Sequence, residues 1–122
     1  MSQWTHINGC IRIDGIPAIE DISKADVKKV FGNTCDYDSP DSQWHLCNVP
    51  CGSEGSLQYE ILQVGDGMVL YTVPIWGDLR DYDDVEAIKK WFDKITSSGL
   101  MIRSAVLQIH VEGKKPIVLS AV

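Results

Sequence analysis

The sequence contains no apolar run that approaches the roughly 18 residues needed to cross a membrane. It opens with Met1-Ser2-Gln3-Trp4, which is not the basic segment and apolar stretch of a secretory signal. These absences favour a cytoplasmic protein with no membrane partner. Because cytoplasmic thiols are kept reduced, the four cysteines are expected to be free thiols or metal ligands rather than disulfides.

Basic residues are in short supply, with 11 Lys and Arg against 17 Asp and Glu and a net charge of −6. Direct binding of nucleic acid is disfavoured, because neutralising phosphates requires a surplus of Lys and Arg. An acidic surface suits basic partners, although solubility alone also explains a charge of this size. With 122 residues, 44% hydrophobic and 23% charged, the chain is expected to form one globular domain over residues 1–122.

Local patterns predict five strands and two helices. Residues 4–14 alternate, with Ile7, Ile11 and Ile13 on one side, as in a half-buried strand. A helix is predicted over 24–31, capped by Ser23 with Asp26, and a second over 84–98, capped by Asp83 with Glu86. The buried stripe of the second helix is expected to consist of Val85, Ile88, Trp91, Phe92 and Ile95.

Further strands are predicted over 57–64, 68–76, 101–112 and 116–121, with Met101 expected in the inner row of the fourth strand. Pro74 cannot donate to a strand ladder, which predicts that its strand ends there or lies at a sheet edge. Residues 33–56 are expected to form a long loop or insertion. The fold class that results is α+β: a ferredoxin-like two-layer sandwich in βαββαββ order, with an antiparallel sheet and both helices on one face.

A candidate zinc site lies in that loop, where Cys35, His45, Cys47 and Cys51 supply the four ligands that zinc binds tetrahedrally. The spacing lacks the usual C-x2-C pair of a zinc finger. The alternative is an exposed histidine and cysteines that act as small buried hydrophobic residues. The expectation for the chain is that it has no cofactor, with zinc in this loop as the alternative.

Two polar segments are candidate partner-binding regions. On the first strand, Trp4, His6 and Arg12 lie on the side opposite the isoleucines, and an exposed Trp with Arg is typical of an interface anchor. The alternative is an ordinary amphipathic strand with Trp4 under a loop.

The second segment is the acidic run that contains Asp78, Arg80 and Asp81. Its carboxylates suit a partner surface, a divalent cation or acid–base work. Acidic residues before a helix also have a structural explanation, since they complement the helix dipole. No nucleotide-binding, hydrolase or metalloprotease motif is present, which argues against an enzyme without deciding the question.

The strand Trp4-Thr5-His6-Ile7-Asn8-Gly9-Cys10-Ile11-Arg12-Ile13-Asp14 and the run Trp76-Gly77-Asp78-Leu79-Arg80-Asp81-Tyr82 resemble small uncharacterised proteins of tailed bacteriophages. With the turn at 52–57, the resemblance covers about a third of the chain. It carries no catalytic residue. It implies a small acidic protein in the host cytoplasm that binds or inhibits host machinery, such as a defence factor.

The leading hypothesis is therefore a non-enzymatic binding protein that engages a protein partner through its open sheet face or its acidic rim. The alternative is a small-ligand binder or sponge, for a nucleotide-like ligand held at an oligomer interface. A small hydrolase is the third hypothesis. A homodimer is compatible with the first two.

Overall fold

The structure, a computed structural model, describes residues 2–15, 22–34, 48–63 and 67–121. These residues form two helices and five strands. In chain order they are β1 (Trp4–Asp14), α1 (Lys24–Phe31), β2 (Gln58–Tyr59), β3 (Val69–Arg80), α2 (Val85–Thr96), β4 (Ile102–Val111) and β5 (Ile117–Ala121). Neither helix is long and apolar enough to span a bilayer, within the described part of the chain.

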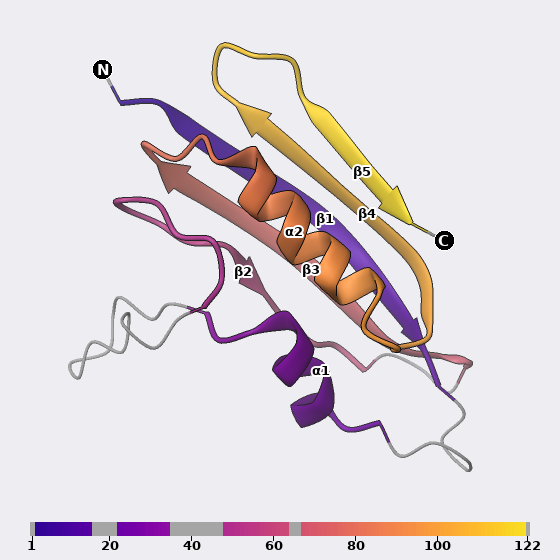
Figure 1. The fold of residues 1–122 in the computed structure, drawn as a ribbon. Helices are drawn as coiled ribbons and strands as arrows, with labels where there is room; N and C mark the ends of the chain where they lie inside the picture. The colour runs from indigo at the N-terminus through magenta and orange to yellow at the C-terminus, as the bar shows by residue number, and fades with distance from the viewer. Residues whose placement is uncertain (1, 16–21, 35–47, 64–66, 122) are drawn as a thin grey trace, which may run out of the picture.

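One open antiparallel sheet contains all five strands, in the order β2-β3-β1-β4-β5 (Figure 1). The three long strands β3, β1 and β4 form its centre. α2 lies over the sheet and runs roughly along the direction of the long strands, and α1 lies beside α2 towards the β2 edge (Figure 1). The prediction of an α+β protein with two helices and an antiparallel sheet is confirmed.

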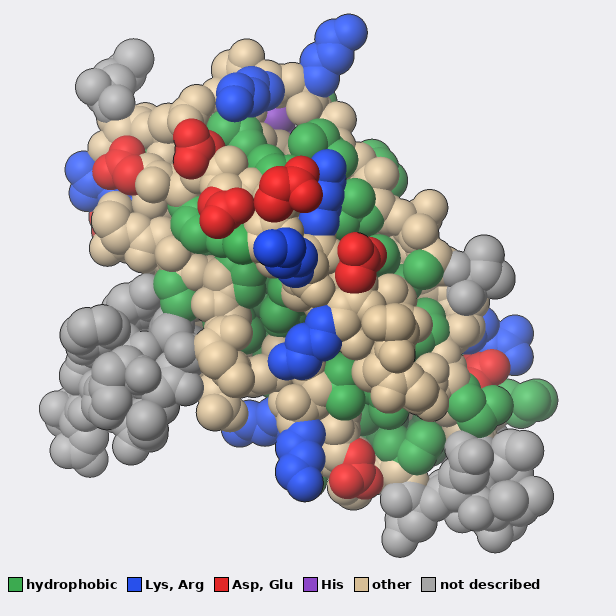
Figure 2. All heavy atoms as spheres, viewed as in Figure 1, with side chains coloured by type: hydrophobic (Ala, Val, Ile, Leu, Met, Phe, Trp, Pro, Cys, Tyr) green, Lys and Arg blue, Asp and Glu red, His purple; other side chains and the backbone are tan. Residues whose placement is uncertain are grey.

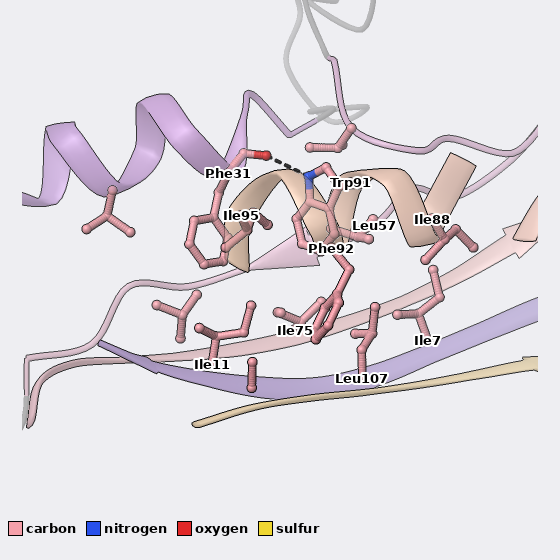
Figure 3. Packing of buried hydrophobic residues seen from close by; sticks show 14 of the residues in the cluster. Ile7, Ile11, Phe31, Leu57, Ile75, Ile88, Trp91, Phe92, Ile95 and Leu107 are labelled. Atoms are coloured by element: carbon pink, nitrogen blue, oxygen red, sulfur yellow. Dashed lines mark hydrogen bonds between the residues drawn. The ribbon is translucent and has the colours of Figure 1, made fainter. Parts of the chain in front are cut away.

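The core fills the space between the helices and the sheet (Figure 3). Ile7 and Ile11 of β1 project towards α2, whose Trp91 and Phe92 are at least 94% buried. The Trp91 indole Nε1 donates a hydrogen bond of 2.7 Å to the carbonyl oxygen of Phe31, which ties α2 to the end of α1. The alternation of β1 and the stripe of α2 therefore face each other as predicted, although Val85 is only partly buried.

The helix caps are confirmed for α1 and corrected for α2. The Ser23 hydroxyl accepts a hydrogen bond from the Asp26 N–H, and the Asp26 carboxylate accepts one from the Ser23 N–H. In α2 the cap is Asp84 rather than Asp83, because the Asp84 carboxylate is the one that reaches the Ala87 N–H, at 3.1 Å. α2 also ends at Thr96, two residues before the predicted end.

The prediction that Pro74 ends its strand or marks an edge is wrong. β3 continues to Arg80 and lies in the sheet interior, with Pro74 opposite Cys10 of β1. The carbonyl oxygen of Pro74 accepts a hydrogen bond from the Glu60 N–H at 3.2 Å. Because the N and C=O groups of one strand residue point to the same side, the N–H that proline lacks would also have pointed towards β2. Regular pairing with β2 is limited to two residues there, so the sheet tolerates a missing donor at this position.

Two other strand predictions need correction. The strand expected over 57–64 is reduced to Gln58–Tyr59, followed by a single bridge between Leu62 and Thr72. Met101 precedes β4 and is 42% exposed, so it is not part of the inner row.

The outer surface of the helix-covered side carries interspersed acidic and basic side chains, as Figure 2 shows.

Candidate interaction face

The side of the sheet that faces away from the helices is called the open face here. In an antiparallel sheet, residues directly opposite one another share a face, so strand pairing defines its members. They are Gln58, Thr72, Pro74, Trp76, Asp78, Arg80, Trp4, His6, Asn8, Cys10, Arg12, Ser104, Val106, Gln108, His110, Val118 and Ser120.

The centre of the open face is neutral and partly apolar. Trp76 is 45% exposed, Val106 44% and Val118 62%. Trp76 lies opposite both Asn8 and Gln58 on its neighbouring strands. An aromatic ring beside side-chain amides, without a formal charge between them, is the composition of an interface centre.

At one end of the open face, His6 joins three strands. Its Nδ1 lies 2.6 Å from Asp78 Oδ1 on β3, and its Nε2 lies 2.9 Å from Oε2 of Glu112, just after β4. Both ring nitrogens therefore face carboxylates, and the imidazole donates to both of them when it is protonated. The hydrogen bond to Asp78, followed by that to Glu112, raises the pKa of His6. The bond to His6 and a second from the Trp4 N–H lower the pKa of Glu112.

A shallow hollow of about 280 Å³ lies beside this cluster and is lined by His6, Ile7, Asn8, Asp78, Gln108 and His110. The His110 ring centroid is 6.2 Å from that of His6. Imidazole, amide and carboxylate groups around one hollow can donate and accept hydrogen bonds with a small polar ligand.

Trp4 and Arg80 lie at the same end and are partly covered. The Arg80 guanidinium donates to Ser2 Oγ at 2.9 Å and to Glu54 Oε2 at 3.1 Å, and it lies 3.8 Å from Asp81 Oδ2. A Cβ atom placed on Gly55 would come within 3.9 Å of Trp4 Cζ3. Trp4 is therefore half-buried beside the 52–55 turn. It is neither a fully exposed interface anchor nor a side chain fully covered by a loop.

Of the six predicted partner-binding residues, Trp4, His6, Asp78, Arg80 and Asp81 come together at this end of the sheet. Asp78 and Arg80 belong to β3, which extends beyond the predicted end at residue 76, and Asp81 occupies the turn that follows, with a φ of 51°. Arg12 is exposed opposite Thr72 and Ser104. Arg12 lies six residue steps along β1 from His6, a distance of about 20 Å.

The structure bears on one predicted zinc ligand only. Cys35, His45 and Cys47 lie outside the described residues, while the thiol of Cys51 donates a 3.1 Å hydrogen bond to the Val49 carbonyl. In the ranges that are described, no three His, Cys, Asp or Glu side chains are grouped as metal ligands. The zinc site stays a prediction.

Sequence reasoning did not select Trp76, Val106, Val118 or Glu112 as functional residues. Trp76 and Val106 alternate with buried residues along β3 and β4, and Val118 alternates with partly buried ones along β5, which is a usable signal. Glu112 carried no such signal, because its role depends on the pairing of β4 with β1.

The described residues thus define a two-layer α+β protein whose sheet is covered by helices on one side and open on the other. No protein-family model, curated protein or solved structure matches the chain.

Proposed function

We propose that this chain is a non-enzymatic binding protein that engages a protein partner through the open face and its acidic rim. The acidic rim is the group Glu54, Asp78, Asp81 and Glu112 at the Trp4 end of the sheet. The exposure of Trp76, Val106 and Val118 on the sheet face that α1 and α2 leave uncovered carries the proposal. The resemblance to phage proteins adds the context that the partner is a host factor whose activity the chain inhibits or modulates.

The arrangement of charge indicates the kind of surface that fits. The neutral centre around Trp76 and Val106 gains free energy when it is covered by apolar groups, at about 25 cal/mol per Å² buried. The rim carboxylates lie beside that centre and would meet Lys or Arg at the periphery of the partner. The partner is therefore expected to present a flat apolar patch bordered by basic side chains.

We also propose that the two layers form a ferredoxin-like sandwich. A ferredoxin-like sandwich is supported by the alternation of strands and helices and by the antiparallel neighbours β4, β1, β3 and β2. The additional strand β5, the two-residue β2 and the lateral position of α1 are departures from that pattern.

The test compares capture by three forms of the chain from a lysate of the native bacterial host. These are the wild type, the open-face variant Trp76→Lys/Val106→Lys, and a control with two charge changes on α2, Glu86→Lys/Lys89→Glu. The control pair lies on the helix-covered side, where the two side chains form an exposed ion pair of 3.3 Å. A protein retained by the wild type and the control, but not by the open-face variant, is then purified and titrated by calorimetry.

A purified partner that binds the wild type and loses at least tenfold in affinity for the open-face variant supports the proposal. Equal affinity for the wild type and the open-face variant would contradict it. So would loss of binding in the α2 control alone.

The hollow beside His6 favours one second candidate, a small-ligand binder. Its neighbours Asp78 and Glu112 disfavour phosphate, so a neutral base or sugar fits better than a nucleotide. Titration of nucleosides and monosaccharides, with Asn8→Ala/Gln108→Ala as the disabled variant, separates this candidate from protein binding.

A further inference from the structure

The strand β5 forms one edge of the sheet, and the charged and proline residues that could block this edge, Lys114, Lys115 and Pro116, lie just before the strand. Within the described residues it pairs with β4 alone, so the hydrogen-bonding groups of its other side have no strand partner. Its five residues, Ile117 to Ala121, include no charge and no proline. Natural edge strands are usually blocked by charge, proline, bulges or extreme shortness, because an open edge accepts another strand.

The opposite edge illustrates that protection. β2 has only two residues, and Glu60 follows it directly. A single bridge from Leu62 to Thr72 then continues the contact with β3. The two edges of the same sheet therefore differ, and only β5 offers a regular strand of five residues.

The inner side of β5 is incompletely covered. Ile117, Leu119 and Ala121 point towards the helix layer and pack against the core, yet each remains partly exposed. Figure 1 shows the reason, because α2 lies over the central strands while β5 lies to one side of α2, at the edge of the sheet. An apolar row at an open edge has both unpaired backbone groups and surface to bury.

We propose that β5 pairs antiparallel with β5 of a second copy of this chain, with the twofold axis at Leu119. Leu119 then lies opposite the same residue of the second copy, and Ile117 lies opposite Ala121. No charge enters the paired segment, and the two Lys114-Lys115 pairs lie at opposite ends of it. The strand can therefore pair with itself without placing a charge between the two copies.

This pairing joins two five-stranded sheets into one continuous sheet. A twofold axis perpendicular to the sheet keeps both helix layers on one side and both open faces on the other. The proposal is therefore independent of the function assigned to the open face. A contact between two short strands buries less than the roughly 1,200 Å² of a standard interface, so the dimer is expected to be weak and concentration-dependent.

The test is a charge complementation at Leu119, measured by sedimentation equilibrium from about 1 µM to about 500 µM, a range that brackets weak association. The wild type is expected to shift from monomer to dimer over this range. Leu119→Lys and Leu119→Glu are each expected to remain monomeric, because like charges then face each other at the axis. Mixed in equal amounts, the two variants are expected to form a heterodimer.

Trp76→Lys is the matched control, since it places the same charge on the open face instead of the β5 edge. A wild type that stays monomeric at the highest concentration overturns the proposal. Dissociation by Trp76→Lys and not by the Leu119 variants also overturns it, and assigns self-association to the open face.

Circular dichroism checks that the Leu119 variants fold. If they do not, Leu119→Cys supplies the test, because cysteines directly opposite each other at the axis can form a disulfide. Oxidation is expected to give a covalent dimer for Leu119→Cys, beyond any formed by the wild type with its own cysteines. Oxidation that gives no more dimer than the wild type overturns the proposal.

Discussion

On the helix-covered face of the sheet, Ile7, Ile11 and Leu107 are at most 3% exposed, whereas Trp76 and Val106 on the open face are 45% and 44% exposed. The same strands supply both sets, since successive residues of a strand point to opposite sides. The first set packs against α1 and α2, and the second is partly exposed to solvent. One face of the sheet therefore stabilises the fold, while the other leaves apolar surface available for a partner.

The sharpest test of this comparison sets Trp91→Ala against Trp76→Ala. Trp91 is 6% exposed and donates to the Phe31 carbonyl, so its removal is expected to cost about 3–5 kcal/mol of unfolding free energy. Trp76 is 45% exposed in the folded protein, so the loss of its side chain is expected to cost under about 1 kcal/mol of unfolding free energy. Denaturant unfolding of both variants measures the difference. Equal losses would show that the two faces are packed alike.

A second test concerns Gly9, which lies on the helix-covered face between Ile7 and Ile11. A Cβ atom at Gly9 would lie 2.2 Å from the carbonyl oxygen of Val106, a backbone atom that cannot rotate away. Gly9→Ala is therefore expected to destabilise the protein by about 1–3 kcal/mol. The matched control is Gly67→Ala, because nothing lies within 4 Å of a Cβ there. An unchanged midpoint for Gly9→Ala would mean that β1 and β4 can separate at this point.

The smallest effect is expected from His6 on the open face. Its folded pKa is raised above the ordinary value of 6.5, so its stabilising contribution is complete below pH 6.5 and is lost as pH rises through the folded pKa. Glu112 has a lowered pKa, so its contribution is present above its ordinary value of 4.5 and is lost as pH falls. Because the His6 side chain is 41% exposed, its contribution is expected to stay below about 1 kcal/mol.

The measurement is the difference in unfolding free energy between the wild type and His6→Gln from pH 4 to pH 9, a range of about 2.5 units on either side of the ordinary pKa of His6. The difference is expected to peak between pH 4.5 and 6.5 and to fall on the alkaline side. His110→Gln is the control, since that ring lies on the same face, 6.2 Å from His6. A difference that increases with pH would contradict the imidazolium assignment.

The sequence predicted the elements better than their pairing. Ser23 and Asp26 determine α1 locally, and the stripe from Ile88 to Ile95 determines α2, so both were visible in the pattern of residues. The position of Pro74 inside the sheet could not be predicted from this pattern. It depends on the pairing of β3 with β2, which is too short to need a hydrogen bond from a backbone N–H at residue 74. The His6 cluster is equally non-local, since Asp78 and Glu112 reach it only through the pairing of β1 with β3 and β4.

The claim that the open face is free surface in the folded protein is tested most directly by the unfolding free energy of the triple variant Trp76→Thr/Val106→Thr/Val118→Thr. Threonine keeps a β-branched side chain suited to strands while removing the exposed apolar groups. The expected result is an unfolding free energy within about 1 kcal/mol of the wild type. A loss of several kcal/mol would contradict the account, because it would show that these side chains already stabilise the fold.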